Sequence, residues 1–484
     1  MEPIPSTSKS TGPFTGPSTS RSTSQSKSQS TSQSTSQSTS EPRKRYKMMF
    51  MPMEGTGHVL TMIGLAYRFL KRHHDITFVV SKSFAKYVAA SPFKIHYIIN
   101  PAFDEYEDPQ ERWSKTMARN AVHFHKTPIE QAWLQGVFHD DFVNTVIDVN
   151  DQLEKIIREV KPDLMFADYY VAVPAIVLAN IPWICVVSAN PLSIYQLIDG
   201  PPFYSGYSIT DSNCNWNDFK RRFRVALSGP CHKLHTYAAE RGLKLPPNRL
   251  WVASPYHNIY IYPLALDYCE IPGFPLRRWS RIDHCIRPFS ADPDPLGLDL
   301  TALKPQSPKI YFTLGTMGSA DIVLMDIILK ILKDTPYQYI VSKGPNGDKI
   351  NLPPNAIGSG YVNQLKILPL VDLVIFHGGN NTLIECLYFG KKMLLLPLFG
   401  DQFDNAARIV DRRLGLALRP YQVKPDDLRR AIVTLLDDDA LHNQLTTISN
   451  NLKKSNSFEK AIEEIESNMH IFKNQSEILA LTTH

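Results

Sequence analysis

Short apolar runs alternate with helical patterns along most of the chain after its first 45 residues. Runs typical of buried strands stand at Lys47–Met51, Asp75–Val80, Lys94–Ile99, Asp163–Asp168 and Trp183–Ser188. Apolar residues at helical spacing predict helices over His58–Lys71, Ser83–Ala90 and Val173–Asn180. Strands and helices that alternate in this way form a parallel sheet with helices on both faces.

A second series of the same kind follows residues 289–308, which are rich in Pro and Asp and are expected to form an interdomain linker. Strands are predicted at Lys309–Gly315, Gln338–Ser342, Asp372–Phe376 and Met393–Pro397, and helices at Ile322–Leu332, from about Asn381, and at Asp404–Arg413. The predicted fold class is therefore α/β, with two Rossmann-like, doubly wound domains at 46–288 and 309–484. Ligands bind open parallel sheets at the carboxyl ends of the strands, so the cleft between the domains is the expected site.

Composition separates residues 1–45 from the rest. Ser, Thr and Gln dominate this tail, Phe14 is its only aromatic residue, and we predict it to be disordered. The tail holds six basic and two acidic residues, so the other 46 basic and 45 acidic residues of the chain nearly balance. That balance argues against a nucleic-acid partner.

No apolar run near the start fits a secretory signal, and none elsewhere is long enough for a membrane span. We therefore expect a cytoplasmic monomer. The six cysteines are scattered without zinc spacing and are expected to be reduced. His123 and His125 have no third ligand in view, and no metal site is expected.

Polar residues gather where the later strands end. His377-Gly-Gly-Asn-Asn-Thr382 joins a buried strand to a helix, and its free amide groups and the positive end of the helix dipole would hold a diphosphate. Gly315-Thr-Met-Gly318 would supply a second phosphate-facing loop. Glu385 would accept hydrogen bonds from ribose hydroxyls, and Asp401 with Gln402 would bind the hydroxyls of a sugar.

The segment Tyr361–Ala406 resembles the donor-binding signature of the UDP-glycosyltransferases, glycosyltransferase family 1 with the GT-B fold, and the resemblance extends over most of the chain from Tyr46. The lack of a signal or membrane anchor aligns the chain with soluble, bacterial-like members. The resemblance implies that Tyr361 stacks on uracil and that the Val362 backbone reads the base. The residues expected on the donor side are Gly57, Gly315, Thr316, Tyr361, Val362, Gln364, His377, Gly379, Asn380, Asn381, Thr382, Glu385, Asp401 and Gln402.

The signature departs from the plant version at three positions. Tyr361 stands in place of one Trp, Gly378 in place of Cys, and Asn380 in place of a second Trp. The first change preserves stacking, whereas the last removes a contact near the sugar or phosphate. Gln402 is the residue that the family pairs with glucose donors, which favours glucose.

His58 follows Gly55-Thr-Gly57 at a strand-to-helix turn, at the mouth of the expected cleft. With an ordinary pKa of about 6.5, a histidine there would accept a proton from an acceptor hydroxyl. Asp168 ends another strand of the same sheet, where its carboxylate would fix the tautomer of the ring. Both residues match the family's catalytic pair, which implies inversion at the anomeric carbon. Residues 101–145 match the family's acceptor region, with Phe124, Trp133 and Phe138 as candidate acceptor-binding residues.

The resulting hypothesis is transfer of a sugar from a UDP-sugar co-substrate to a small hydrophobic acceptor such as a phenol, flavonoid or foreign compound, without a metal or other cofactor. Two alternatives share the fold: a catalytically silent sugar-nucleotide binding protein and a nucleotide-sugar epimerase. A Rossmann-type oxidoreductase is disfavoured, because Gly55-Thr-Gly57 lacks the full GxGxxG spacing.

Overall fold

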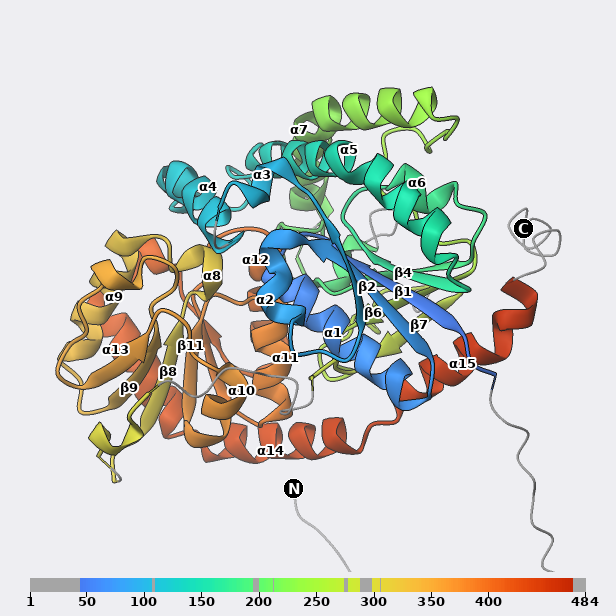
Figure 1. Ribbon diagram of the computed structural model, residues 1–484. Coiled ribbons are helices and arrows are strands. Elements are labelled where there is room, and N and C mark those ends of the chain that lie inside the picture. Colours follow the sequence, from blue (N-terminus) through green and yellow to red (C-terminus); the bar gives the residue numbers. More distant parts are fainter. Residues whose placement is uncertain are drawn as a thin grey trace, which may run out of the picture. The chain divides into compact units, whose positions relative to one another are not determined.

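Two parallel β-sheets form the framework of the computed structural model (Figure 1), which describes residues 44–106, 109–194, 200–211, 213–273, 277–287, 298–304 and 306–472. The two sheets belong to one compact unit that begins at Arg45. Residues 1–43 of the predicted disordered tail and half of the predicted linker at 289–308 lie outside the described residues.

The N-terminal sheet has seven strands in the order β3-β2-β1-β4-β5-β6-β7. Its strands are β1 (Lys47–Pro52), β2 (Asp75–Ser81), β3 (Lys94–Ile98), β4 (Leu164–Asp168), β5 (Trp183–Val187), β6 (His257–Ile261) and β7 (Trp279–Ile282). Its helices are α1 (Thr56–Lys71), α2 (Ala85–Val88), α3 (Pro101–Asp104), α4 (Pro109–Phe124), α5 (Leu134–Val160), α6 (Pro174–Val177) and α7 (Asn213–Glu240). The central strands are buried along almost their whole length, as expected for parallel strands covered by helices on both faces.

The C-terminal sheet has six strands in the order β10-β9-β8-β11-β12-β13. Its strands are β8 (Lys309–Thr313), β9 (Gln338–Ser342), β10 (Ala356–Ser359), β11 (Leu373–Phe376), β12 (Lys392–Leu395) and β13 (Leu416–Ala417). Its helices are α8 (Gly315–Gly318), α9 (Ile322–Lys333), α10 (Gln364–Ile367), α11 (Asn380–Tyr388), α12 (Gln402–Asp411), α13 (Pro425–Leu436), α14 (Asp439–Lys454) and α15 (Ser457–Phe472). The predicted α/β class with two Rossmann-like sheets is confirmed.

The register of the strands fixes the positions of the polar groups that follow them. Pro52 of β1 lies opposite Asp168 of β4, so the loop that leads to α1 begins beside this carboxylate. Thr313 of β8 lies opposite Phe376 of β11, which brings Gly315 and His377 to the same edge of the C-terminal sheet.

Several elements differ from the sequence prediction. The helix predicted over Val173–Asn180 is only α6, and Asn180 has a left-handed backbone with φ of 53° that an α-helix does not accommodate. The long helices α5 and α7 and the strands β6, β7, β10 and β13 were not predicted. In α7, Gly229 and Pro230 lie within a helix that continues through them, although Pro normally interrupts a helix.

The last helix packs on the N-terminal sheet, next to β7 (Figure 1). Glu466 of α15 accepts hydrogen bonds from the Arg72 guanidinium at 2.6 and 2.7 Å, and His74 Nε2 lies 2.9 Å from the same carboxylate. The chain therefore returns, after the C-terminal sheet is complete, to close the half that it built first.

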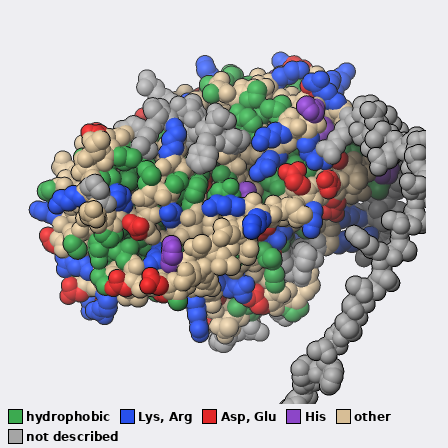
Figure 2. Space-filling view, turned by 90° about the horizontal axis from the view of Figure 1, so that it is seen from below, with side chains coloured by type: hydrophobic (Ala, Val, Ile, Leu, Met, Phe, Trp, Pro, Cys, Tyr) green, Lys and Arg blue, Asp and Glu red, His purple; other side chains and the backbone are tan. Residues whose placement is uncertain are grey.

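The described surface carries charges of both signs. Figure 2 shows Lys and Arg, Asp and Glu, and hydrophobic side chains spread over one face of the molecule. No helix among the described residues combines the length and the apolar character that a membrane crossing requires.

Candidate active site

A cavity of about 360 Å³ lies between the carboxyl ends of the two sheets. Every residue expected on the donor side lines it, and so does His58. We call the lining residues contributed by Tyr311–Gln402 the C-terminal wall and those contributed by Met53–Tyr204 the N-terminal wall. Chain segments that are far apart in the sequence thus meet at the edge where open parallel sheets bind ligands.

His58 and Asp168 are in direct contact in the N-terminal wall. His58 Nδ1 lies 2.8 Å from Asp168 Oδ2, and the Ser188 hydroxyl donates to the same carboxylate oxygen at 2.6 Å while lying 2.9 Å from His58 Nδ1. A carboxylate facing Nδ1 keeps the proton of neutral imidazole on that nitrogen, which leaves the lone pair of Nε2 available to accept another proton. Tyr170 packs edge-on against the ring, with the centroids 5.3 Å apart.

Opposing electrostatic effects act on the pKa of His58. Burial alone lowers the pKa of the imidazole, but the charge and hydrogen bond of Asp168, followed by the charge of Asp401, outweigh it and raise the pKa above its ordinary value. The carboxylate of Asp168 is almost fully buried, with a residue exposure of 3%. The arrangement stabilises the imidazolium ion that a proton-accepting histidine becomes.

The turn after β11 is built around the ring of His377. A Cβ atom on Gly315 would lie 2.5 Å from the ring, and one on Gly379 would lie 2.4 Å from it, so both positions exclude any side chain. Burial lowers the pKa of His377 to about 4, which keeps the imidazole neutral near pH 7. The ring therefore contributes hydrogen-bonding groups to the C-terminal wall and no net charge.

Glu385 and its neighbours form a polar group one turn into α11. The Gln364 side-chain amide donates to the Glu385 carboxylate and lies 3.2 Å from the hydroxyl of Thr382. Arg287, which is 8% exposed, reaches within 3.8 Å of the same carboxylate from the end of the N-terminal domain. Tyr361 lines the cavity and is 39% exposed.

Asp401 and Gln402 lie at the start of α12. The backbone amide of Asn190 donates to Asp401 at 3.2 Å, and burial raises the pKa of this carboxyl group. Gln402 Oε1 accepts hydrogen bonds from the backbone amides of Leu398 at 3.0 Å and Phe399 at 3.3 Å. Its carbonyl oxygen is thus engaged by the protein, and its NH₂ group is the part that a ligand would meet.

The side chains of Asn380 and Asn381, two residues expected on the donor side, form hydrogen bonds to the N-terminal domain. The Asn380 amide donates to the carbonyl of Ser188 at 2.7 Å, and the Asn381 amide donates to the carbonyl of Gly57 at 2.8 Å. Both side chains reach across to the N-terminal domain although both residues line the cavity.

Of the three aromatic residues expected to bind an acceptor, only Phe138 lines the cavity. Phe124 is buried behind it and packs on Phe399 with the ring centroids 5.1 Å apart. Trp133 is 44% exposed at the start of α5 and packs on His123. Phe124 and Trp133 are therefore not lining residues.

Sequence reasoning missed several residues of the N-terminal wall. Met53, Glu54, Leu60, Gln135, Phe142, Tyr170, Ser188 and Tyr204 all line the cavity. Ser188 ends a strand that the sequence predicted, so the strand-end argument that singled out Asp168 applied to it as well. Arg287 follows β7, which was not predicted, and no sequence signal marked it.

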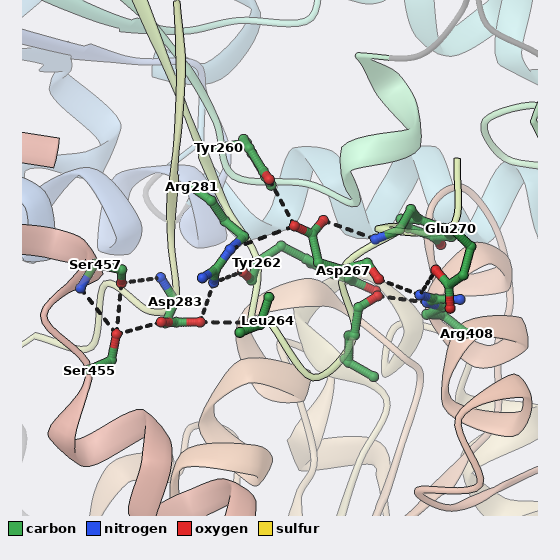
Figure 3. Close-up of polar contacts among 12 residues, drawn as sticks. Tyr260, Tyr262, Leu264, Asp267, Glu270, Arg281, Asp283, Arg408, Ser455 and Ser457 are labelled. Atoms are coloured by element: carbon green, nitrogen blue, oxygen red, sulfur yellow. Dashed lines mark hydrogen bonds and ion pairs between the residues drawn. The ribbon is translucent and has the colours of Figure 1, made fainter. Parts of the chain in front are cut away.

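A second set of polar contacts joins the halves outside the cavity (Figure 3). Arg408 of α12 is 1% exposed, donates to the carbonyl of Leu266 at 2.6 Å and to that of Asp267, and pairs with Glu270 at 2.8 Å. Asp267 also accepts from the Tyr260 hydroxyl at 2.8 Å, and burial raises its pKa to about 6. These contacts fix α12 and its first residues, Asp401 and Gln402, against the N-terminal domain.

Arg281 and Asp283 extend this network toward α15 (Figure 3). Arg281 pairs with both Asp267 and Asp283, and Asp283 accepts a hydrogen bond from the Ser455 hydroxyl. The backbone amide of Asp283 donates to Ser457 at 3.0 Å. Within the described residues, no group of three or more His, Cys, Asp or Glu side chains has the arrangement of a metal site.

Comparison with known proteins agrees with this geometry. Residues 306–460 match the family model described as UDP-glucoronosyl and UDP-glucosyl transferase. The chain is 22% identical over 434 residues to NDP-glycosyltransferase YjiC of Bacillus subtilis, covering 88% of this chain and 98% of that protein. It is also 22% identical over 438 residues to human UDP-glucuronosyltransferase 1A8, covering 83% of this chain and 78% of that protein.

Solved structures share the fold. The glycosyltransferase of kitacinnamycin aligns with a TM-score of 0.65 at 16% identity, over 87% of this chain and 99% of that one. Glycosyltransferase VinC, solved in complex with DTDP, aligns with a TM-score of 0.60 at 15% identity, over 89% and 100%. The solved structures share the GT-B fold with this chain, and together with the family match over residues 306–460 and the relatives, these similarities support a glycosyltransferase that uses a nucleotide-sugar donor.

Proposed function

We propose that this enzyme transfers glucose from UDP-glucose to a hydroxyl group of a small hydrophobic acceptor, such as a phenol, a flavonoid or a foreign compound, with inversion at the anomeric carbon. The observation that carries the proposal is the contact of His58, Asp168 and Ser188 at the wall of a cavity that every residue expected on the donor side also lines. In such a reaction the enzyme detoxifies or conjugates its acceptor.

His58 acts as the general base in this proposal. Its Nε2 accepts the proton of the acceptor hydroxyl, and the oxygen attacks the anomeric carbon from the face opposite UDP, through a transition state with oxocarbenium character. The bond from that carbon to the diphosphate oxygen breaks, and UDP leaves with the electron pair. Asp168 stabilises the imidazolium, and a single displacement of this kind inverts the configuration.

The C-terminal wall would hold the donor. Tyr361 would stack on uracil, Glu385 would bind the ribose hydroxyls, and the NH₂ group of Gln402 would bind the sugar beside the Asp401 carboxylate. The amide groups at the start of α11 and the positive end of its dipole would stabilise the charge that grows on the leaving diphosphate. This electrostatic contribution is the basis for proposing that the reaction needs no metal.

The N-terminal wall supports a hydrophobic acceptor. Its side chains include Met53, Leu60, Phe138, Phe142, Tyr170 and Tyr204. Pockets of this kind bury most of a small ligand in apolar contacts, and a few polar groups set its orientation.

Turnover assays test the proposal. Purified enzyme is incubated with UDP-glucose and a panel of phenolic acceptors, products are identified by mass spectrometry, and the anomeric configuration is read by NMR. We expect a β-glucoside from the α-linked donor, and no product from His58→Ala although that variant still binds UDP. A protein that binds UDP-glucose but gives no product with any acceptor would instead be a silent binder, and retained configuration would exclude direct displacement.

A further inference from the structure

The first two residues of α11, Asn380 and Asn381, form side-chain hydrogen bonds to the opposite domain. Asn381 donates to the Gly57 carbonyl at 2.8 Å and accepts from the Thr61 hydroxyl at 2.9 Å. Asn380 donates to the Ser188 carbonyl at 2.7 Å and to the Ile261 carbonyl at 3.4 Å. We call this pair of residues the asparagine clasp; α11 and α1 lie next to each other in Figure 1.

The partners of the clasp adjoin the His58–Asp168 dyad. Gly57 precedes His58, and the side chain of Ser188 contacts both His58 and Asp168. Asn381 therefore fixes the backbone from which His58 projects. Asn380 fixes the backbone of Ser188, whose hydroxyl donates to the Asp168 carboxylate.

The donor and acceptor atoms of these amides are arranged for this role. Both carbonyl groups that contact Asn380 take hydrogen bonds from its NH₂ group, which leaves that nitrogen no hydrogen to offer a phosphate. Its Oδ1 is buried and makes no hydrogen bond to the described residues, and an oxygen acceptor would repel an anion. Asn381 uses both ends of its amide on Gly57 and Thr61. The Asn380 side chain is therefore not set to bind the diphosphate, and the Asn381 side chain is already engaged by the opposite domain.

We propose that Asn380 and Asn381 are positioning residues that set the geometry of the His58–Asp168 dyad from the donor-binding domain. The inference rests on the proposed role of His58 as base. Because the clasp belongs to the helix that faces the donor diphosphate, the base reaches its working geometry only when the donor-binding domain is docked against it. Catalysis and domain closure are thereby coupled through two amides.

Thr61→Val tests the clasp without altering the C-terminal wall. Valine keeps the shape of the buried threonine and removes the hydroxyl that Asn381 accepts from. Thr77→Val is the matched control, since Thr77 is equally buried on β2 and does not line the cavity. Asn380→Asp provides a second variant, in which a carboxylate oxygen replaces the NH₂ group that faces the Ser188 carbonyl.

We expect Thr61→Val to lower kcat about 10-fold, as for loss of one positioning hydrogen bond, while the Kd for UDP measured by calorimetry stays unchanged. Asn381→Ala removes the hydrogen bonds to both Thr61 and Gly57 and should lower kcat at least as much, and adding Thr61→Val to it should lower kcat little further, because the interaction that the two residues share is already lost. The acid limb of the kcat–pH profile should move to lower pH. A looser contact with Asp168 leaves burial, which lowers the pKa of His58, as the larger influence.

The positioning role of the clasp is excluded if Thr61→Val and Asn380→Asp have the same kcat and the same pH profile as Thr77→Val. It is also excluded if Asn381→Ala weakens UDP binding while kcat at saturating donor is preserved, since that result would make Asn381 a donor ligand. His58→Ala is assayed alongside. Full turnover by that variant would overturn the proposed function together with the clasp, whereas an inactive His58→Ala with an unaffected Thr61→Val overturns the clasp alone.

Discussion

The two walls of the cavity are built from the chain in different ways. The C-terminal wall comes mainly from the contiguous segment Tyr361–Gln402, in which each strand end contributes a compact group of polar residues. The N-terminal wall is assembled from separate pieces: the segment from the end of β1 into α1, the first turns of α5, the loops after β4 and β5, and the loop at Tyr204. A short stretch of sequence can therefore reveal most of the C-terminal wall, whereas the N-terminal wall forms only when the fold brings distant segments together.

Variants that impair one wall and leave the other intact test this comparison, and Asp168→Asn is expected to have the largest effect. An amide NH₂ facing His58 Nδ1 would favour the tautomer with the proton on Nε2, which removes the lone pair that accepts the proton. We expect kcat to fall about 10²–10⁴-fold. UDP affinity, measured by calorimetry, should stay as in the wild type, because Asp168 does not line the cavity. A loss of UDP affinity equal to the loss of kcat would mean that the walls do not act separately.

Glu385→Ala is the converse test: it should weaken UDP binding at the C-terminal wall and leave kcat nearly unchanged. Loss of hydrogen bonds to a charged group costs about 1.5–3 kcal/mol, so the Kd for UDP should rise about 10-fold to 100-fold. The kcat at saturating donor should change much less. Titration with UDP and steady-state kinetics measure the two quantities, and a variant with unchanged Kd but low kcat would contradict the ribose-binding assignment.

The tightness of the C-terminal wall is tested by Gly379→Ala. A methyl group there would collide with the His377 ring at 2.4 Å, and overpacking of this kind costs about 1–3 kcal/mol of unfolding free energy. Gly229→Ala in α7 is the control, because its Cβ position meets open space and removing a helical glycine stabilises by about 0.5–1 kcal/mol. In thermal unfolding, the melting temperature of Gly379→Ala should therefore fall and that of Gly229→Ala should rise.

The smallest expected effects distinguish two phenylalanines of the N-terminal half. Phe138 and Phe124 both pack on Phe399, but only Phe138 lines the cavity. Leucine at either position should lower the melting temperature slightly, whereas only Phe138→Leu should raise the KM for a phenolic acceptor. An equal rise in KM for Phe124→Leu would show that the acceptor extends further between α4 and α5 than the cavity does.

The sequence predicted the C-terminal wall well because strand ends and polar residues coincide there within about one-tenth of the chain. It failed on α5 and α7, whose amphipathic patterns are long and, in α7, interrupted by Gly229-Pro230. Side-chain direction was also beyond its reach. Whether Asn381 turns to a phosphate or to Gly57 depends on how the second domain docks, which local pattern does not encode. Arg287 enters the cavity only through that docking. Phe124 and Trp133 do not line the cavity, because Phe124 is buried in the core and Trp133 is partly exposed to solvent.

The return of α15 to the N-terminal sheet has a consequence for chimeric enzymes. A single crossover in the linker at 289–308 would exchange the C-terminal sheet together with α15, and the recipient would lose the partners of Arg72 and His74. It would also pair a foreign α12 with the loop that receives Arg408 (Figure 3). An exchange of donor specificity with a relative should therefore use two crossovers, one in the linker and one between α14 and α15, and should transplant residues 264–270 with α12. In genetic terms the interchangeable module is an internal segment of the gene. The codons for α15 must come from the same parent gene as those for the N-terminal domain.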